Sequence, residues 1–254
     1  MTGVNIGRPL RGVATLVMLS LGCASIGLAQ SPAQSPAAAS SPAASSPADP
    51  HDLNGLWQGP YTPDLARAYG KELPFTPYGL ERWKKVDTAY DPTAVCLPVG
   101  PARGIQAPMP FQIVQTKDVT TLLFEYQHTF RMIYADGRKP PDDIADYPEW
   151  MGFSSGRWEG DTLVVDTVAV NDRTWLDTAG HEHSDKLRLT ERFRKTAPDS
   201  IEWTVTFDDS VFFTQPWSVT RTLRRLKATD RVMSYSCEEN NRDVPHLVPK
   251  TGRP

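Results

Sequence analysis

Apolar and polar residues alternate along much of the chain after Phe111. The alternation is clearest over residues 121–134, where every second residue from Leu122 to Tyr134 is apolar or aromatic, except for His128. A period of two predicts a β-strand with one buried face. A strand of this length usually curves, so we expect it to wrap around a barrel.

Further segments have strand-like patterns, at residues 53–58, 111–117, 152–158, 162–170, 186–195, 200–207, 217–226 and 231–238. Turn signals separate them, for example Asp136-Gly137 and Glu159-Gly160-Asp161. No helical pattern interrupts the strands once they begin. We therefore predict a mainly β fold, an antiparallel up-and-down β-barrel of about nine or ten strands, because a closed barrel leaves no exposed sheet edge.

The region before these strands has a different pattern. Apolar residues recur at helical spacing within residues 63–72 and 77–87, and each segment has a proline or aspartate near its start, which predicts two short helices. Residues 91–110 are rich in proline, so we expect irregular coil there.

The motif Gly-x-Trp-x-Gly occurs twice, at residues 55–59 and at 156–160. In a barrel, Trp57 or Trp158 could plug one end while the flanking glycines let backbones approach closely. The first copy, NGLWQG, resembles the GxW signature at the first strand of lipocalins and related calycins, which implies a calycin-like barrel.

The N-terminus has the features of a secretory signal peptide over residues 1–29. Arg8 and Arg11 precede an apolar run that is too short for a membrane span, and small residues follow it. Gly22-Cys23 also fits a lipoprotein cleavage site, so Cys23 could carry a lipid that tethers the protein to a membrane. Residues 30–50 are mostly Ser, Pro and Ala, which predicts a disordered linker, and residues 51–254 have the length of a single barrel domain. The expected location is periplasmic or at the cell surface.

Two cysteines remain in the predicted domain. In an oxidising compartment Cys96 and Cys237 could form a disulfide, and two separate buried thiols are the alternative. The formal charge of −3 offers no basic surface, which argues against a nucleic-acid partner. No phosphate-binding glycine loop, CxxC pair or haem motif is present, so we expect no cofactor.

Several polar residues lie in phase with apolar neighbours on predicted strands, which would point them into the barrel. They are Asp166, Glu191, Arg221 and His128. A buried unpaired carboxylate costs several kcal/mol, so these groups must pair or face a wet cavity. One interpretation is an internal network with Arg221 between Asp166 and Glu191.

The other interpretation of the inward polar groups is a ligand pocket in the barrel mouth. There they would hold one end of a hydrophobic or amphipathic molecule, and aromatic side chains would line the rest. The candidates for this role are Tyr126, Trp158 and Trp203 beside Asp166, Arg221 and His128.

The segment NDRTWLDTAGHEHSDK, residues 171–186, is a second concentration of polar residues. His183 or His181 could act as a base with Asp177, Asp166 or Glu191 as carboxylate partner. The spacing from the histidines to Glu191 does not fit a cupin site, and we predict no metal. No G-x-S-x-G frame supports Ser184 as a nucleophile. A polar loop that ties the barrel rim by hydrogen bonds is the alternative.

A longer resemblance covers roughly residues 95–240. The motifs DGR, WMGFSSGRWEGDTLVVDT, WLD, HSD and ERF, at residues 136–193, are similar to those of a family of exported bacterial proteins of unknown function. The resemblance implies an exported globular domain and no established activity. From the residues we expect an exported barrel that binds a small hydrophobic or amphipathic molecule, with a lyase, isomerase or hydrolase or a structural surface domain as alternatives.

Overall fold

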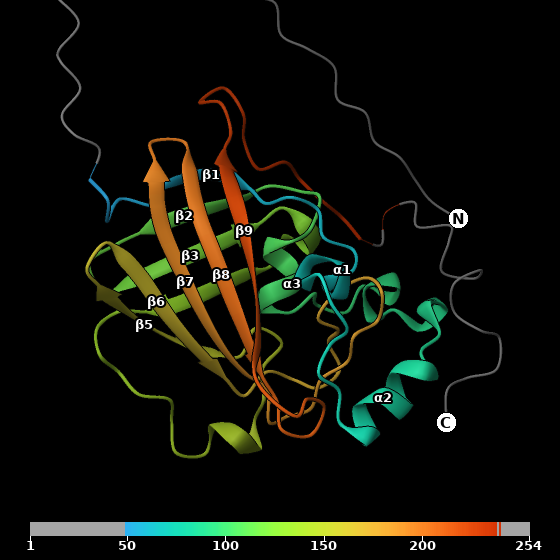
Figure 1. Cartoon of the computed structure of the whole chain (residues 1–254). Coiled ribbons are helices and arrows are strands. Elements are labelled where there is room, and N and C mark those ends of the chain that lie inside the picture. Colours follow the sequence, from blue (N-terminus) through green and yellow to red (C-terminus); the bar gives the residue numbers. More distant parts are fainter. Residues whose placement is uncertain (1–48, 238, 240–254) are drawn as a thin grey trace, which may run out of the picture. The chain divides into compact units, whose positions relative to one another are not determined.

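Nine strands form a closed barrel in the computed structural model of this chain, which describes residues 49–237 and 239 (Figure 1). The spatial order of the strands is their order in the chain, and the last strand pairs with the first. The predicted barrel with few helices is thereby confirmed. The strands are β1 (Gly55–Gln58), β2 (Phe111–Gln115), β3 (Val119–Phe124), β4 (Phe130–Tyr134), β5 (Phe153–Glu159), β6 (Thr162–Val168), β7 (Arg188–Ala197), β8 (Ser200–Asp208) and β9 (Trp217–Arg225).

One pair of neighbouring strands is parallel. β4 and β5 run in the same direction, with Tyr134 opposite Ser155, whereas every other neighbouring pair is antiparallel. The barrel is therefore mixed rather than purely up-and-down. A parallel pair needs a long connection, and residues 135–152 provide it by returning the chain to the end where β4 began.

The prediction of one long strand over residues 121–134 is wrong, because the chain forms the β3–β4 hairpin there. The turn η3 (Tyr126–His128) has left-handed backbone at Gln127 (φ 58°) and His128 (φ 47°), although neither is glycine. The turn inverts the side-chain phase, so Arg131 points inward and Phe130 is 60% exposed. Residues 231–236 form no strand either, and the two errors cancel in the strand count.

The helices lie before β2, as expected. The two predicted helices are present as α1 (Leu65–Tyr69) and α2 (Pro77–Lys84), capped by Asp64 and Thr76. The expected coil at 91–110 is partly helical, because Pro101 begins α3 (Pro101–Ile105), a position where proline's missing N–H costs nothing. Short 3-10 turns are η1 (Thr88–Tyr90), η2 (Pro92–Val95) and η4 (Ile144–Asp146). No helix among the described residues has the length and apolar character needed to cross a bilayer.

Large side chains fill the barrel interior. They include Trp57, Phe111, Phe193, Trp203 and Phe207, each at most 1% exposed. Trp57 donates from Nε1 to the carbonyl of Leu53, 2.9 Å away, and so fixes the start of β1.

The two Gly-x-Trp-x-Gly copies have different roles. A Cβ on Gly59 would lie 2.5 Å from the carbonyl oxygen of Ile105, so this glycine lets α3 approach β1. The predicted close approach is present at the first copy, next to buried Trp57. Trp158 in the second copy is only partly buried, and its ring lies 4.3 Å from that of His51.

Four connections lie at the same end of the barrel, which we call the helical end. They are residues 59–110, 125–129, 169–187 and 209–216, as the strand pairings require. Figure 1 shows α1 and α3 beside β9, with α2 farther from the strands. The polar segment at 171–186 therefore lies among the helices.

A disulfide joins Cys96 to Cys237, as predicted, with their Cα atoms 5.7 Å apart. It attaches the segment after β9 to the turn η2 at the helical end. The predicted signal peptide, Cys23 and almost all of the predicted linker lie outside the described residues.

Candidate functional site

Glu191 points into the barrel, as predicted, but its partner is Arg131. Both side chains are at most 1% exposed, and the guanidinium contacts both carboxylate oxygens. Arg131 also donates to Ser154 and Thr167, and Trp203 donates from Nε1 to Glu191 over 3.1 Å. Each buried charge is thus balanced and hydrogen-bonded, which identifies the group as an internal structural pair. The sequence prediction missed Arg131 because the unexpected hairpin inverted its phase.

The other three residues predicted to point inward do not join this pair. Asp166 lies on the outer face, where it pairs with Arg157 and accepts a hydrogen bond from Thr190. The prediction that it faces the interior is wrong, because β6 places Val165 and Thr167 inside instead. The predicted Asp166–Arg221–Glu191 network is therefore wrong as well.

Arg221 lies midway along β9 on the face of buried Val219 and Leu223, as its phase predicted, and its side chain reaches the connection 59–110. Arg221 is half-buried and donates from Nε to Thr62, and burial lowers the pKa of its guanidinium. His128 was expected inside the barrel, but it belongs to the η3 turn, and its Nε2 accepts from the backbone N–H of Tyr235 over 2.6 Å. It anchors the segment after β9 rather than lining the barrel.

The three aromatic candidates are scattered. Trp203 lies inside the barrel, fully buried against Glu191. Trp158 packs on His51 next to the β5–β6 turn, away from the helical end. Tyr126 lies at the helical end and lines a small cleft of about 240 Å³. The structure does not gather them into one pocket.

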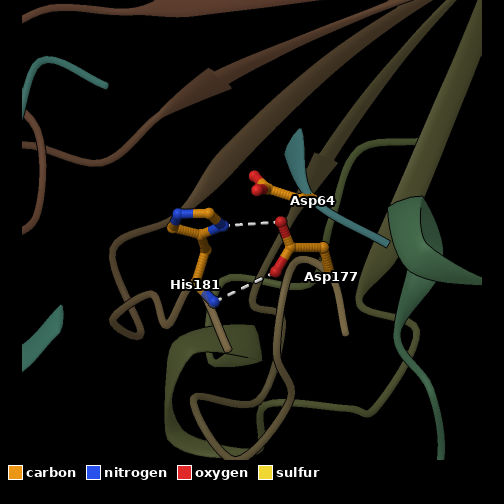
Figure 2. Close-up of side chains that lie close together, drawn as sticks. All are labelled: Asp64, Asp177 and His181. Atoms are coloured by element: carbon orange, nitrogen blue, oxygen red, sulfur yellow. Dashed lines mark hydrogen bonds and ion pairs between the residues drawn. The ribbon is translucent and has the colours of Figure 1, made fainter. Parts of the chain in front are cut away.

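Asp177 and His181 form a buried pair, shown in Figure 2 with Asp64. The His181 Nδ1 lies 2.5 Å from the Asp177 Oδ2, and the backbone N–H groups of Leu65, Gly180 and His181 also donate to this carboxylate. The His181 ring stacks on Trp83, with the centroids 4.1 Å apart, and is 1% exposed. A carboxylate that orients a histidine is typical of a general base, but this ring is covered by α2.

Asp64 completes a cluster whose ligand atoms lie within 4.8 Å of one another (Figure 2). One carboxylate oxygen of Asp64 caps α1, and the other pairs with Arg67. N–H donors occupy both oxygens of Asp177, so a cation would have to displace existing hydrogen bonds. We assign the cluster to the attachment of α1 to the 171–186 segment, and the expected absence of a metal stays a prediction.

His183 is also buried, and both ring nitrogens have partners. Its Nδ1 lies 2.9 Å from the carbonyl of Ser184 and its Nε2 lies 2.7 Å from the Thr174 hydroxyl. A carbonyl only accepts, so Nδ1 carries the proton and Nε2 accepts from Thr174. Burial lowers the pKa of His183, which favours this neutral ring. His183 therefore ties the rim together, as the structural alternative for this loop predicted.

A cleft of about 370 Å³ opens beside these histidines, between the η1–η2 region and residues 172–182. We call it the rim cleft. Apolar and aromatic side chains form much of its wall: Ala89, Pro92, Val95, Leu97 and Trp175.

The charges of the rim cleft are mostly paired. Arg82 and Glu182 form two parallel hydrogen bonds of 2.8 and 2.7 Å, which raise the pKa of Arg82 and join α2 to the 171–186 segment. Asp91 pairs with buried Arg103. The exposed residues Asp172 and Arg173 carry opposite charges next to each other. The polar part of the cleft is thus close to electrically balanced.

Sequence reasoning identified the loop of the rim cleft but not its wall. Asp177, His181 and His183 hold this loop in place from inside, whereas Trp175 and Glu182 face the cleft. The partner segment, residues 82–97, was expected to be coil and helix without a role. Val95 and Leu97, on either side of Cys96, are too short an apolar run to predict a ligand site.

Comparisons with known proteins yield no assignment. No protein-family model matches the chain, and no curated protein has a significantly similar sequence.

Proposed function

We propose that this chain is an exported protein that binds a small amphipathic molecule in the rim cleft. The observation that carries the proposal is a cleft of about 370 Å³ with an apolar wall and balanced charges at its edge. Clefts of about 300–1,000 Å³ with mostly apolar walls and a few polar groups are typical of small-molecule sites. A molecule with an alkyl body and a zwitterionic or neutral polar head fits this wall best.

The proposed position differs from the calycin-like cavity that the sequence suggested. Trp57, Trp203 and their neighbours fill the interior, and the Arg131–Glu191 pair occupies its polar part. The barrel then serves as a rigid support for the loops that bind, an arrangement common among binding proteins.

Two observations support export. The Cys96–Cys237 disulfide is stable in an oxidising compartment, and the first 29 residues have the pattern of a signal peptide. The motif similarity to exported bacterial proteins agrees with both. Lipidation of Cys23 would add a membrane tether to the same binding domain.

Dodecylphosphocholine, kept below its micelle concentration, is a suitable probe because it has a zwitterionic head and one alkyl chain. At about −0.3 kcal/mol per non-hydrogen atom for about 23 atoms, we expect a Kd of about 10 µM by calorimetry. Ala89→Trp would fill the rim cleft and should weaken binding at least tenfold. Ala145→Trp, outside this cleft, is the matched control and should bind as the wild type does. Equal binding by all three proteins would refute the proposal.

The two histidines predicted to act as bases are buried. His181 and His183 are each at most 3% exposed, and the latter has a partner on both ring nitrogens. The lyase, isomerase or hydrolase therefore stays a prediction, which the oriented His181–Asp177 pair favours.

A further inference from the structure

A second, larger cleft of about 680 Å³ lies on the outside of the barrel. One wall is the β4–β5 connection, with Pro140, Ile144 and Pro148. The other wall is formed by the end of β6, residues 185–188 at the beginning of β7, and Asp208 and Ser210 at the end of β8. This second cleft and the rim cleft have no lining residue in common.

This cleft continues along the outer face of the sheet. A neighbouring cleft of about 360 Å³ shares Val168, Arg188 and Asp208 with it and adds the hydroxyl groups of Thr190 and Thr206. We call the two together the outer groove. Arg188 lies where they meet, with apolar side chains on one side and hydroxyl groups on the other.

Arg188 has no hydrogen bond or ion pair from its side chain within the part of the chain that the structure describes. The other cation of the groove, Lys186, pairs with Asp185 over 2.9 Å. Asp208 is opposite Arg188 in the β7–β8 register but forms no ion pair with it. A guanidinium presents a planar fork of donors that matches a carboxylate, so this one is available to a ligand.

The backbone of the groove is strained at one position. Ala169, on the wall next to Val168, has φ of 55°, which costs a residue with a Cβ about 1–2 kcal/mol. A hydrogen bond of 3.0 Å from the Glu149 N–H to the Ala169 carbonyl holds this conformation. Residues in such conformations cluster at ligand sites, where the surrounding structure maintains them. The hydrogen bond between Glu149 and Ala169 joins the β4–β5 connection to the end of β6, where the two walls of the groove meet.

We propose that the outer groove binds a monocarboxylic acid with an apolar chain, as a second ligand distinct from that of the rim cleft. The carboxylate pairs with the Arg188 guanidinium, and the chain lies along Pro140, Ile144 and Pro148. Asp166, Asp185 and Asp208 also line the groove, and their repulsion of an anion grows with its charge, so they disfavour a phosphate dianion more than a single carboxylate. The hydroxyl groups of Thr190 and Thr206, on the other side of Arg188, already bond Asp166 and Ser218, and this ligand does not need them.

Titration with dodecanoate at low salt tests this proposal, with dodecanol as the uncharged comparison. We expect Arg188→Gln to weaken dodecanoate binding at least tenfold and to leave dodecanol binding within twofold. Arg192→Gln is the matched control, because Arg192 lies on the same face of β7 but pairs with Glu159 outside the groove. It should leave both affinities within twofold of the wild type.

Substitutions that fill one cleft at a time locate the ligand. Ala145→Trp should abolish dodecanoate binding, and Ala89→Trp should preserve it. Loss of dodecanoate binding in Ala89→Trp alone would place the acid in the rim cleft and overturn the proposal. Dodecanoate affinity unchanged by Arg188→Gln, or no binding by the wild type, would overturn it too. The dodecylphosphocholine titration tests the rim cleft separately, so the two proposals can fail independently.

Discussion

Removing one member of the Arg131–Glu191 pair should strongly destabilise the barrel. Among the described residues, Arg131→Met leaves the Glu191 carboxylate in the core with Trp203 as its one remaining side-chain donor. Because the site is at most 1% exposed, water cannot compensate for the lost cation. Breaking a buried pair by removing one partner typically costs about 3–5 kcal/mol.

A second substitution should recover part of this loss. Glu191→Gln on the Arg131→Met background removes the unpaired charge, while the amide keeps an acceptor for Trp203 and gains donors for the neighbouring hydroxyl groups. We expect the double variant to be about 2 kcal/mol more stable than Arg131→Met alone, because it no longer buries an unpaired charge.

Urea unfolding followed by tryptophan fluorescence measures these differences. The dependence of the free energy on urea concentration should stay constant, so that midpoints report stability. The free energy of unfolding of a globular domain is about 5–15 kcal/mol, so Arg131→Met could lose most of it. If this variant is largely unfolded in water, a stabilising osmolyte can be added equally to all variants. An Arg131→Met stability within about 1 kcal/mol of the wild type would contradict this energetic role of the pair. So would a further loss of stability when Glu191→Gln is added to Arg131→Met.

Three more predictions follow from the fold. Replacing Cys96 and Cys237 by serine should cost about 5 kcal/mol, because the bond closes a loop of 141 residues. The loss should appear as a lower urea midpoint, and no change would mean that the bond is absent in solution. Because burial lowers the pKa of His183, the unfolded state binds a proton first as the pH falls. The contribution of His183 to the free energy of unfolding should be fully present above pH 6.5 and decrease below it. His183→Gln should flatten this part of the pH dependence of unfolding. An unchanged slope would count against a neutral His183 ring. Gly59→Ala should cost about 2–3 kcal/mol in thermal unfolding, because its Cβ would lie 2.5 Å from the backbone oxygen of Ile105. Gly104→Ala should cost less, because its Cβ would lie 3.2 Å from a ring carbon of Phe124. Equal losses in the two variants would contradict the Gly59 contact.

The barrel was predictable because strand alternation and turn residues are local signals. The Glu159-Gly160-Asp161 turn joins β5 to β6 where its sequence indicates. The η3 turn was not predictable, since Gln127 and His128 adopt left-handed backbone without glycine, and the alternation continues across them. One unrecognised turn reversed the phase of the next strand, so Arg131 was placed outside and Phe130 inside.

The candidate site was predictable in position but not in role. The concentration of Asp177, His181 and His183 correctly marked a structured loop at the barrel rim. Their function in holding that loop depends on Leu65, Trp83 and other residues far away in the chain, and such pairings follow from tertiary packing rather than local pattern. The outer groove likewise combines the β4–β5 connection with β7, which no sequence period relates.

The most direct test locates a bound amphipathic molecule. Intermolecular NOEs from the alkyl protons of dodecylphosphocholine can be measured to the methyl groups of Val95 and Leu97 in the rim cleft and of Val205 in the barrel interior. Binding in the rim cleft predicts NOEs to the first two residues and none to Val205. NOEs to Val205 without any to Val95 and Leu97 would place the ligand inside the barrel and contradict the proposed site.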